Sequence, residues 1–153
     1  MPDGVTAKTL QFIGLLLTAI ALAAGLAHVF ELPHKIALPR EQYLVVQQIY
    51  RGWQWIGIAI VGALIASAAL AVMWRGSGTP FGLAVVAAVC IGASLIVFFA
   101  ITFPINQATS NWTVLPGDWE ALRRRWEVSH AIDAALYFAA FVALALSAFV
   151  ERP

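Results

Sequence analysis

The sequence has little charge. Only 11% of its 153 residues are Asp, Glu, Lys or Arg, whereas soluble domains use about 25%. The chain is also 61% apolar, above the roughly 45–50% typical of soluble domains. A fold surrounded by water could not bury this much apolar surface. The composition therefore excludes an ordinary soluble domain and predicts membrane lipid as a partner.

The low net charge and the scarcity of cysteine exclude other classes of protein. The formal net charge is +1, so nothing in the composition points to nucleic acid as a partner. Cys90 is the single cysteine, which excludes a disulfide within the chain. We find no repeat, second domain or low-complexity linker. Residues 1–153 are therefore expected to form one transmembrane domain.

Four apolar segments predict four membrane-spanning helices. They cover residues 9–30, 53–74, 81–103 and 131–150. Each is about as long as the 20 or so residues that cross a bilayer core. The first segment exceeds the roughly 7–15 apolar residues of a cleaved signal peptide, so we interpret it as a span.

The connections predict an all-α, up-down four-helix bundle. The second and third spans are joined by the short turn 75–80, whereas connections 31–52 and 104–130 are long. Both long connections then lie at one end of the bundle, and the termini and the short turn at the other. We call these the long-loop end and the terminal end.

Helical pieces in the long connections predict that helices two and four extend beyond the bilayer. The second helix is expected to run over about 40–74, and the fourth from an N-cap at Asp118 into its span. Pro33 and Pro104 are expected to end the first and third helices.

Imidazoles and carboxylates gather at the long-loop end. His28 and Glu31 are neighbours at i, i+3 on the first helix, and Glu127 and His130 repeat this spacing on the fourth. If the two helices are adjacent, these groups could bind a transition metal such as Fe, Cu or Zn. Without a metal they could act as acid and base. The candidate metal ligands are His28, Glu31, His34, Glu127 and His130.

The fourth helix predicts one mixed aromatic and charged face. Its members recur at helical spacing, and they are Trp119, Arg123, Trp126, His130, Asp133 and Tyr137. Arg51 or Arg123 could stabilise an anion, and Asn106 could bridge the loop and the site. The candidate catalytic residues are His28, Glu31, Asn106, Arg123 and His130. The candidate substrate pocket comprises Gln47, Tyr50, Arg51, Trp53, Trp112, Trp119, Trp126, Asp133 and Tyr137.

Residues 104–130 resemble the signature of the anthrone-oxygenase-like family of small four-span membrane proteins. The matching positions are Pro104, Asn106, Trp119, Arg123, Trp126, Glu127 and His130. Asp133 departs from the pattern, because many relatives carry an arginine there. The four spans and the length also agree with the family.

The resemblance implies an oxidoreductase. Fungal members of the family oxidise anthrones to anthraquinones with molecular oxygen, without an added organic cofactor. The expected function is therefore an oxygenase-like reaction on a lipophilic aromatic or quinone-like molecule at the membrane boundary. Two alternatives stay open: a protein that binds a metal or ligand without catalysis, and a structural or accessory subunit.

Basic residues give an expected orientation. Six of the nine lie at the long-loop end, so the positive-inside rule places the long loops in the cytoplasm. We expect a bacterial-type inner membrane. The sequence leaves open whether the chain forms a homo-oligomer.

Overall fold

The computed structural model describes residues 4–150, which form helices and loops and contain no strand. Four long helices dominate, and short helical pieces lie at the long-loop end. The long helices are α1 (Gly4–Lys35), α3 (Ile56–Met73), α4 (Thr79–Val97) and α6 (Trp119–Leu146). The short pieces are α2 (Arg40–Gln47), η1 (Gln48–Tyr50), η2 (Trp53–Trp55), η3 (Phe98–Thr102) and α5 (Phe103–Ala108). The predicted all-α bundle is confirmed.

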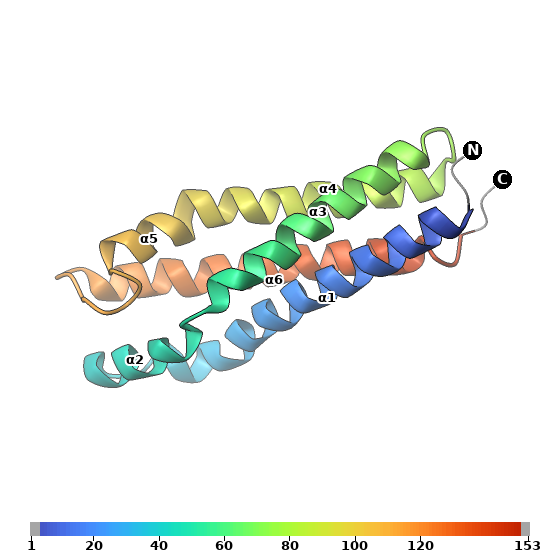
Figure 1. Cartoon of the computed structure of the whole chain (residues 1–153). Coiled ribbons are helices and arrows are strands. Elements are labelled where there is room, and N and C mark those ends of the chain that lie inside the picture. The colour runs from blue at the N-terminus through green and yellow to red at the C-terminus, as the bar shows by residue number, and fades with distance from the viewer. Residues whose placement is uncertain (1–3, 151–153) are drawn as a thin grey trace.

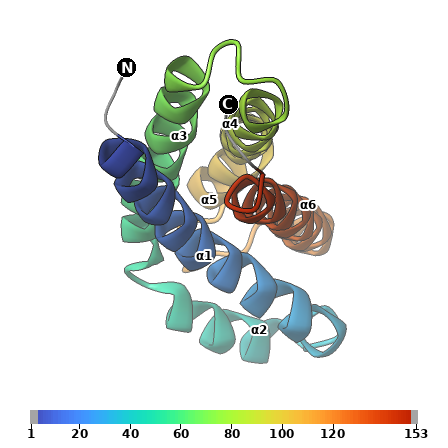
Figure 2. The same cartoon turned by 90° about the vertical axis from the view of Figure 1, so that its right-hand side faces the viewer.

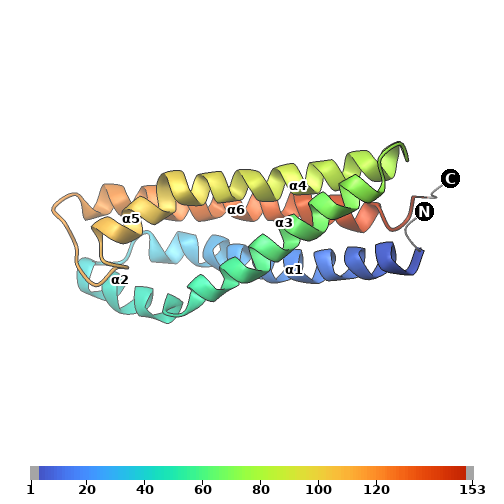
Figure 3. The ribbon, with the colours of Figure 1, turned by 45° about the horizontal axis from the view of Figure 1, so that its top comes forward.

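The four long helices form an up-down ring. α1 packs against α3 and α6, and α4 packs against the same two helices (Figures 1 and 2). The α3–α4 turn lies beside the start of α1 and the end of α6, while α2 and α5 lie at the opposite end (Figure 3). The first and fourth spans are therefore adjacent, as a shared site requires.

Four helical stretches are long and apolar enough to cross a membrane: Gly4–Lys35, Trp53–Met73, Thr79–Ala108 and Trp119–Leu146. Large apolar side chains point outward from them, as with Ile58 and Ile96, which are 69% and 70% exposed. Water would solvate such a surface poorly, and lipid solvates it well. The chain is an integral membrane protein.

A close approach of α1 and α6 holds the bundle together near the long-loop end. A Cβ atom added to Gly25 would lie 3.0 Å from the Cα of Ala134. Small residues allow such backbone proximity, and van der Waals packing then stabilises the helix pair within lipid. Because His28 follows Gly25 by about one turn, this contact sets its position against α6.

Neither proline ends its helix as predicted. α1 contains Pro33 and continues to Lys35, with the next amide, that of Ile36, donating to the Leu32 carbonyl at 3.0 Å. The third span runs from α4 through the π-helical turn η3 and continues as α5, which carries Pro104 in its first turn. Proline has no amide N–H, so the continuous helix lacks one backbone hydrogen bond at Pro104, directly after the π-helical turn.

The predicted continuous helix over 40–74 is also wrong. Gly52 has φ = 94°, and it separates the turns η1 and η2. This left-handed conformation is easily adopted only by glycine, and it breaks the helix. α2 therefore folds back toward α6 instead of extending α3. The fourth helix does run without a break from Trp119 to Leu146, and Asp118 lies at its N-cap without making a capping side-chain hydrogen bond.

Candidate functional site

A buried lysine occupies the centre of the long-loop end. Lys35 is only 2% exposed, and its ammonium donates to the Tyr50 hydroxyl at 2.5 Å. The same Nζ lies 3.3 Å from His28 Nδ1, 3.4 Å from Glu31 Oε2 and 3.3 Å from Glu127 Oε2. We call His28, Glu31, Lys35, Tyr50, Glu127 and His130 the Lys35 cluster.

The continuation of α1 past Pro33 creates this centre. His28, Glu31 and Lys35 lie at i, i+3 and i+7, which is one face of a helix. Had α1 ended at Pro33, the ammonium would not share that face.

Two carboxylates balance the charge of Lys35. Glu127 is 1% exposed, its Oε2 pairs with Lys35, and its Oε1 accepts a hydrogen bond from the Tyr43 hydroxyl at 2.9 Å. Glu31 accepts from the Tyr50 hydroxyl, and its side chain is 38% exposed. Buried charges require such pairing. Glu31 is thus the accessible carboxylate and Glu127 the enclosed one.

Both phenols remain neutral hydrogen-bond donors. Burial, followed by the Glu127 carboxylate, raises the pKa of Tyr43 well above its usual value. Burial and the hydrogen bond to Glu31 raise the pKa of Tyr50 in the same direction. A phenolate in either place would face a carboxylate in a medium of low dielectric.

The two histidines stack on each other. The rings of His28 and His130 lie 4.1 Å apart at an interplanar angle of 6°. Trp126 presents an edge-on contact to both, at 5.1 Å from His28 and 4.2 Å from His130. The rings thus meet face to face, with no ring nitrogen of one pointing at the other.

Aromatic side chains wall the cluster. Trp53 packs against His28 and Tyr50, and Trp112 packs against Tyr43 and Trp126. Asn106 accepts a hydrogen bond from Trp126 Nε1 at 2.8 Å, which fixes the indole next to the histidines. The second long connection thus contributes Trp112 to the wall and Asn106, which holds Trp126 in place.

Trp112 is held in a strained turn. It ends the run Ser110–Asn111–Trp112, in which φ is 46°, 54° and 60°. Residues other than glycine rarely adopt this conformation, at a cost of roughly 1–3 kcal/mol each. The turn is fixed by a 2.7 Å hydrogen bond from the Asn111 amide to the Asn106 carbonyl, and by burial of the Trp112 indole.

Several predicted site residues lie outside the cluster. Arg123 is buried, donates to the Leu38 carbonyl at 2.8 Å and lies over the rings of Tyr43 and Trp119. It therefore anchors the first long connection. Arg51 is exposed and donates to Gln48. Gln47 is buried and lies next to Tyr43.

The predicted metal-ligand set does not assemble. Among residues 4–150, no three His, Cys, Asp or Glu side chains are grouped so that they could hold a metal ion. His34 is exposed, and the Lys35 ammonium occupies the space between the carboxylates. A cation is thus already present where the metal was expected.

Asp133 and Tyr137 lie deeper in the bundle. They are 4% and 6% exposed, and Asp133 Oδ1 has no hydrogen-bond partner among the described residues. Both belong to the face of the fourth helix that was predicted to carry His130.

Sequence reasoning missed Lys35 and Tyr43. Lys35 is one of the six basic residues at the long-loop end, and the expected end of the helix at Pro33 would have placed it in a loop. Its spacing of seven from His28 and four from Glu31 was a usable signal. Tyr43 had no such signal, since it reaches Glu127 from α2, across 84 positions of sequence.

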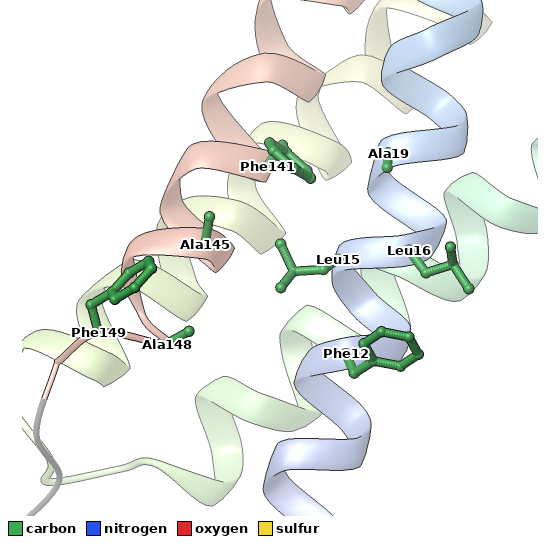
Figure 4. Close-up of a pocket in the computed structure, with 8 residues that line it drawn as sticks. All are labelled: Phe12, Leu15, Leu16, Ala19, Phe141, Ala145, Ala148 and Phe149. Atoms are coloured by element: carbon green, nitrogen blue, oxygen red, sulfur yellow. The ribbon is translucent and has the colours of Figure 1, made fainter.

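An apolar groove lies away from the cluster. It has a volume of about 410 Å³ and is lined by Phe12, Leu15, Leu16, Ala19, Phe141, Ala145, Ala148 and Phe149 (Figure 4). These residues come from the first half of α1, the end of α6 and the turn that follows α6, and none is polar. The groove offers room for hydrocarbon and no group for chemistry.

Comparisons with known proteins gave no relative: no family model, no curated protein and no solved structure matches the chain.

Proposed function

We propose that the chain is a membrane enzyme which removes a proton from a lipophilic, weakly acidic aromatic molecule, so that molecular oxygen oxidises the resulting anion. One observation carries the proposal. The buried Lys35 ammonium lies 2.5–3.4 Å from a phenol, an imidazole and two carboxylates. Groups of this kind, when gathered around a buried ammonium, can take a proton and hold a negative charge.

The proposed role of each residue follows from whether a substrate can reach it. Glu31 is the half-exposed carboxylate, so it is placed to act as the base. Lys35 and the Tyr50 hydroxyl lie beside it and would stabilise an enolate or phenolate. Trp53 and Trp126 offer flat surfaces for an aromatic ring. Lys35 thus takes the anion-stabilising role that sequence reasoning gave to Arg51 or Arg123.

An anthrone-like ring serves as the model substrate. Glu31 takes one proton from the ring CH₂, and the anion adds to molecular oxygen to give a peroxide, which is then protonated. Loss of the remaining C–H proton and of hydroxide leaves a ketone. The net change is CH₂ + O₂ → C=O + H₂O. Oxygen is the oxidant, and both substrate hydrogens leave in water.

The signature in residues 104–130 supports membership of the anthrone-oxygenase-like family, which we propose together with the activity. We also propose that the long loops face the cytoplasm of a bacterial-type inner membrane. Four exposed arginines support this orientation even after the buried Lys35 and Arg123 are discounted: Arg40, Arg51, Arg124 and Arg125.

Oxygen uptake by protein reconstituted in liposomes, with anthrone as substrate, tests the activity. We expect Glu31→Gln and Lys35→Met to lower kcat/KM by about 100-fold or more, as loss of a base or anion-stabilising group does. His34→Ala and Lys8→Met are the matched controls, since both residues are exposed, and should stay within about twofold of wild type.

The proposal fails if wild-type protein consumes no oxygen above empty liposomes, or if Glu31→Gln retains full activity. Circular dichroism and gel filtration of each variant separate loss of chemistry from loss of fold.

A further inference from the structure

We propose that Asp133 is a neutral carboxylic acid inside the membrane, and that it stores a proton for the Lys35 cluster through His130. The role in catalysis rests on the proposed function, whereas the protonation state of Asp133 does not. Neither assignment depends on a metal or cofactor.

The first support is the surroundings of the carboxyl group. Asp133 lies within the membrane-spanning helix α6 and is 4% exposed, and its Oδ1 has no hydrogen-bond partner among the described residues. An ionised carboxylate so placed would need a cation or several hydrogen-bond donors. Protonation removes that need.

The second support is the distribution of cations in the bundle. α3, α4 and η3 contain no Lys, Arg or His, so a counter-ion can come only from α1 or α6. Gly25 of α1 packs against Ala134, next to Asp133. At 1.5 Å per residue, Lys35 is about 15 Å from that level along α1, and Lys8 is about 25 Å away in the other direction. Lys35 is already paired with Glu31 and Glu127.

The remaining titratable groups near this level are few. His130 and Tyr137 lie on the same face of α6, His28 lies on α1, and Cys90 is the single titratable residue of α4. A positive charge on His28 or His130 would lie close to the Lys35 ammonium, which is 3.3 Å from His28 Nδ1. Like charges repel strongly in a medium of low dielectric. The imidazoles are therefore poor counter-ions for an Asp133 carboxylate.

The third support is the position of Asp133 close to the cluster. Glu127, His130 and Asp133 follow each other at intervals of three residues on one helix face, and all three contact the bundle interior. His130 stacks on His28, and its Nε2 has no hydrogen-bond partner among the described residues. His130 thus has a free nitrogen one helical turn from Asp133.

The proposed reaction gives this proton a use. The peroxide formed from the substrate anion must be protonated before hydroxide can leave. Asp133 donates that proton through His130 and recovers a proton when Glu31 returns the one taken from the substrate. The cycle leaves Asp133 as it began.

Infrared spectroscopy of the reconstituted protein tests the neutral acid directly. We expect the wild-type spectrum at neutral pH to contain a carbonyl band of a protonated carboxylic acid that shifts in deuterated water. Asp133→Asn should lack this band, and the control Glu120→Gln, an exposed site on the same helix, should keep it. A wild-type-minus-Asp133→Asn difference that contains only carboxylate bands would overturn the assignment.

Kinetics test the proton-storing role separately. Asp133→Asn should lower kcat by about tenfold or more with KM unchanged, and the loss should grow as bulk buffer is diluted. Equal kcat in Asp133→Asn and wild type would overturn the role even if the infrared band is present. If wild-type protein has no oxidase activity, the role fails with the proposed function, while the band still decides the protonation state.

Discussion

At the scale of single residues, Lys35 is buried because its charge is shared among several partners. Tyr50 accepts its hydrogen bond, Glu31 and Glu127 lie within 3.4 Å, and the rings of Tyr50 and Trp126 face the ammonium. A lysine without such partners would be expelled to the membrane surface. The site is therefore also a structural element of the long-loop end.

Removing one partner of the buried ion pair should destabilise the protein. We expect Lys35→Met to cost about 3–5 kcal/mol, because it leaves Glu127 charged and uncompensated. The double variant Lys35→Met/Glu127→Gln should recover much of that loss. Chemical unfolding in detergent micelles measures both, with Lys8→Met as the control. Equal stabilities for the single and double variants would contradict this prediction, because an unpaired Glu127 would then cost nothing.

The raised pKa values of Tyr43 and Tyr50 predict how stability changes at alkaline pH. Because the fold raises the pKa of Tyr43 and Tyr50, the folded state holds these protons more tightly than the unfolded state. Their contribution to stability is complete below pH about 10, the usual tyrosine pKa, and is lost as pH rises above it. In a Tyr137→Phe background, tyrosinate absorbance should therefore appear only together with loss of helical circular dichroism. Tyrosinate in a protein that keeps its helical signal would contradict this.

At the scale of helices and turns, Gly25 sets the contact between α1 and α6. Gly25→Ala should destabilise the bundle by about 1–3 kcal/mol, because the new methyl group meets the α6 backbone. Gly92→Ala is the matched control, since a Cβ there has nothing within 4 Å. Thermal unfolding in micelles measures the difference. Equal effects of the two substitutions would show that close packing at Gly25 is unimportant.

Hydropathy and helical period predict the spans and the continuous fourth helix, and the structure contains both. The adjacency of the first and fourth helices was a premise of the predicted site, and the structure supplies it. It failed at Pro33, Gly52 and Pro104, where the outcome depends on local backbone geometry and on tertiary contacts. A proline disfavours a helix only on average, and at Pro33 the buried ion pairs of Lys35 favour one further turn. Tyr43 could not be identified, because the bend at Gly52 had to be known first.

At the scale of the whole molecule, charge is concentrated at one end and hydrocarbon surrounds the rest. The long-loop end carries the Lys35 cluster and an exposed set of arginines, whereas the terminal end carries the apolar groove of Figure 4. In the proposed function, the lipid-soluble substrate comes from the membrane, and protons exchange with the aqueous phase that adjoins the long-loop end.

This polarity predicts a membrane topology. In a Cys90→Ala background, a cysteine at the exposed Gln42 should be shielded from a membrane-impermeant maleimide added outside intact cells. A cysteine at Ser77, in the α3–α4 turn, should react. Permeabilised cells should label at both positions. Labelling of Gln42→Cys alone in intact cells would reverse the proposed orientation.

The continuous helix α6 also limits where insertions and deletions can be tolerated in this protein. One face of α6 carries Glu127, His130, Asp133 and Tyr137 only while the number of residues between them is fixed. Each inserted residue would rotate the following part of the helix by about 100°. One residue inserted after Glu127 would turn Asp133 and Tyr137 away from the bundle interior and toward the acyl chains. Length changes should therefore accumulate among descendants in the linker before Trp119, while the stretch from Trp126 to Tyr137 keeps its length.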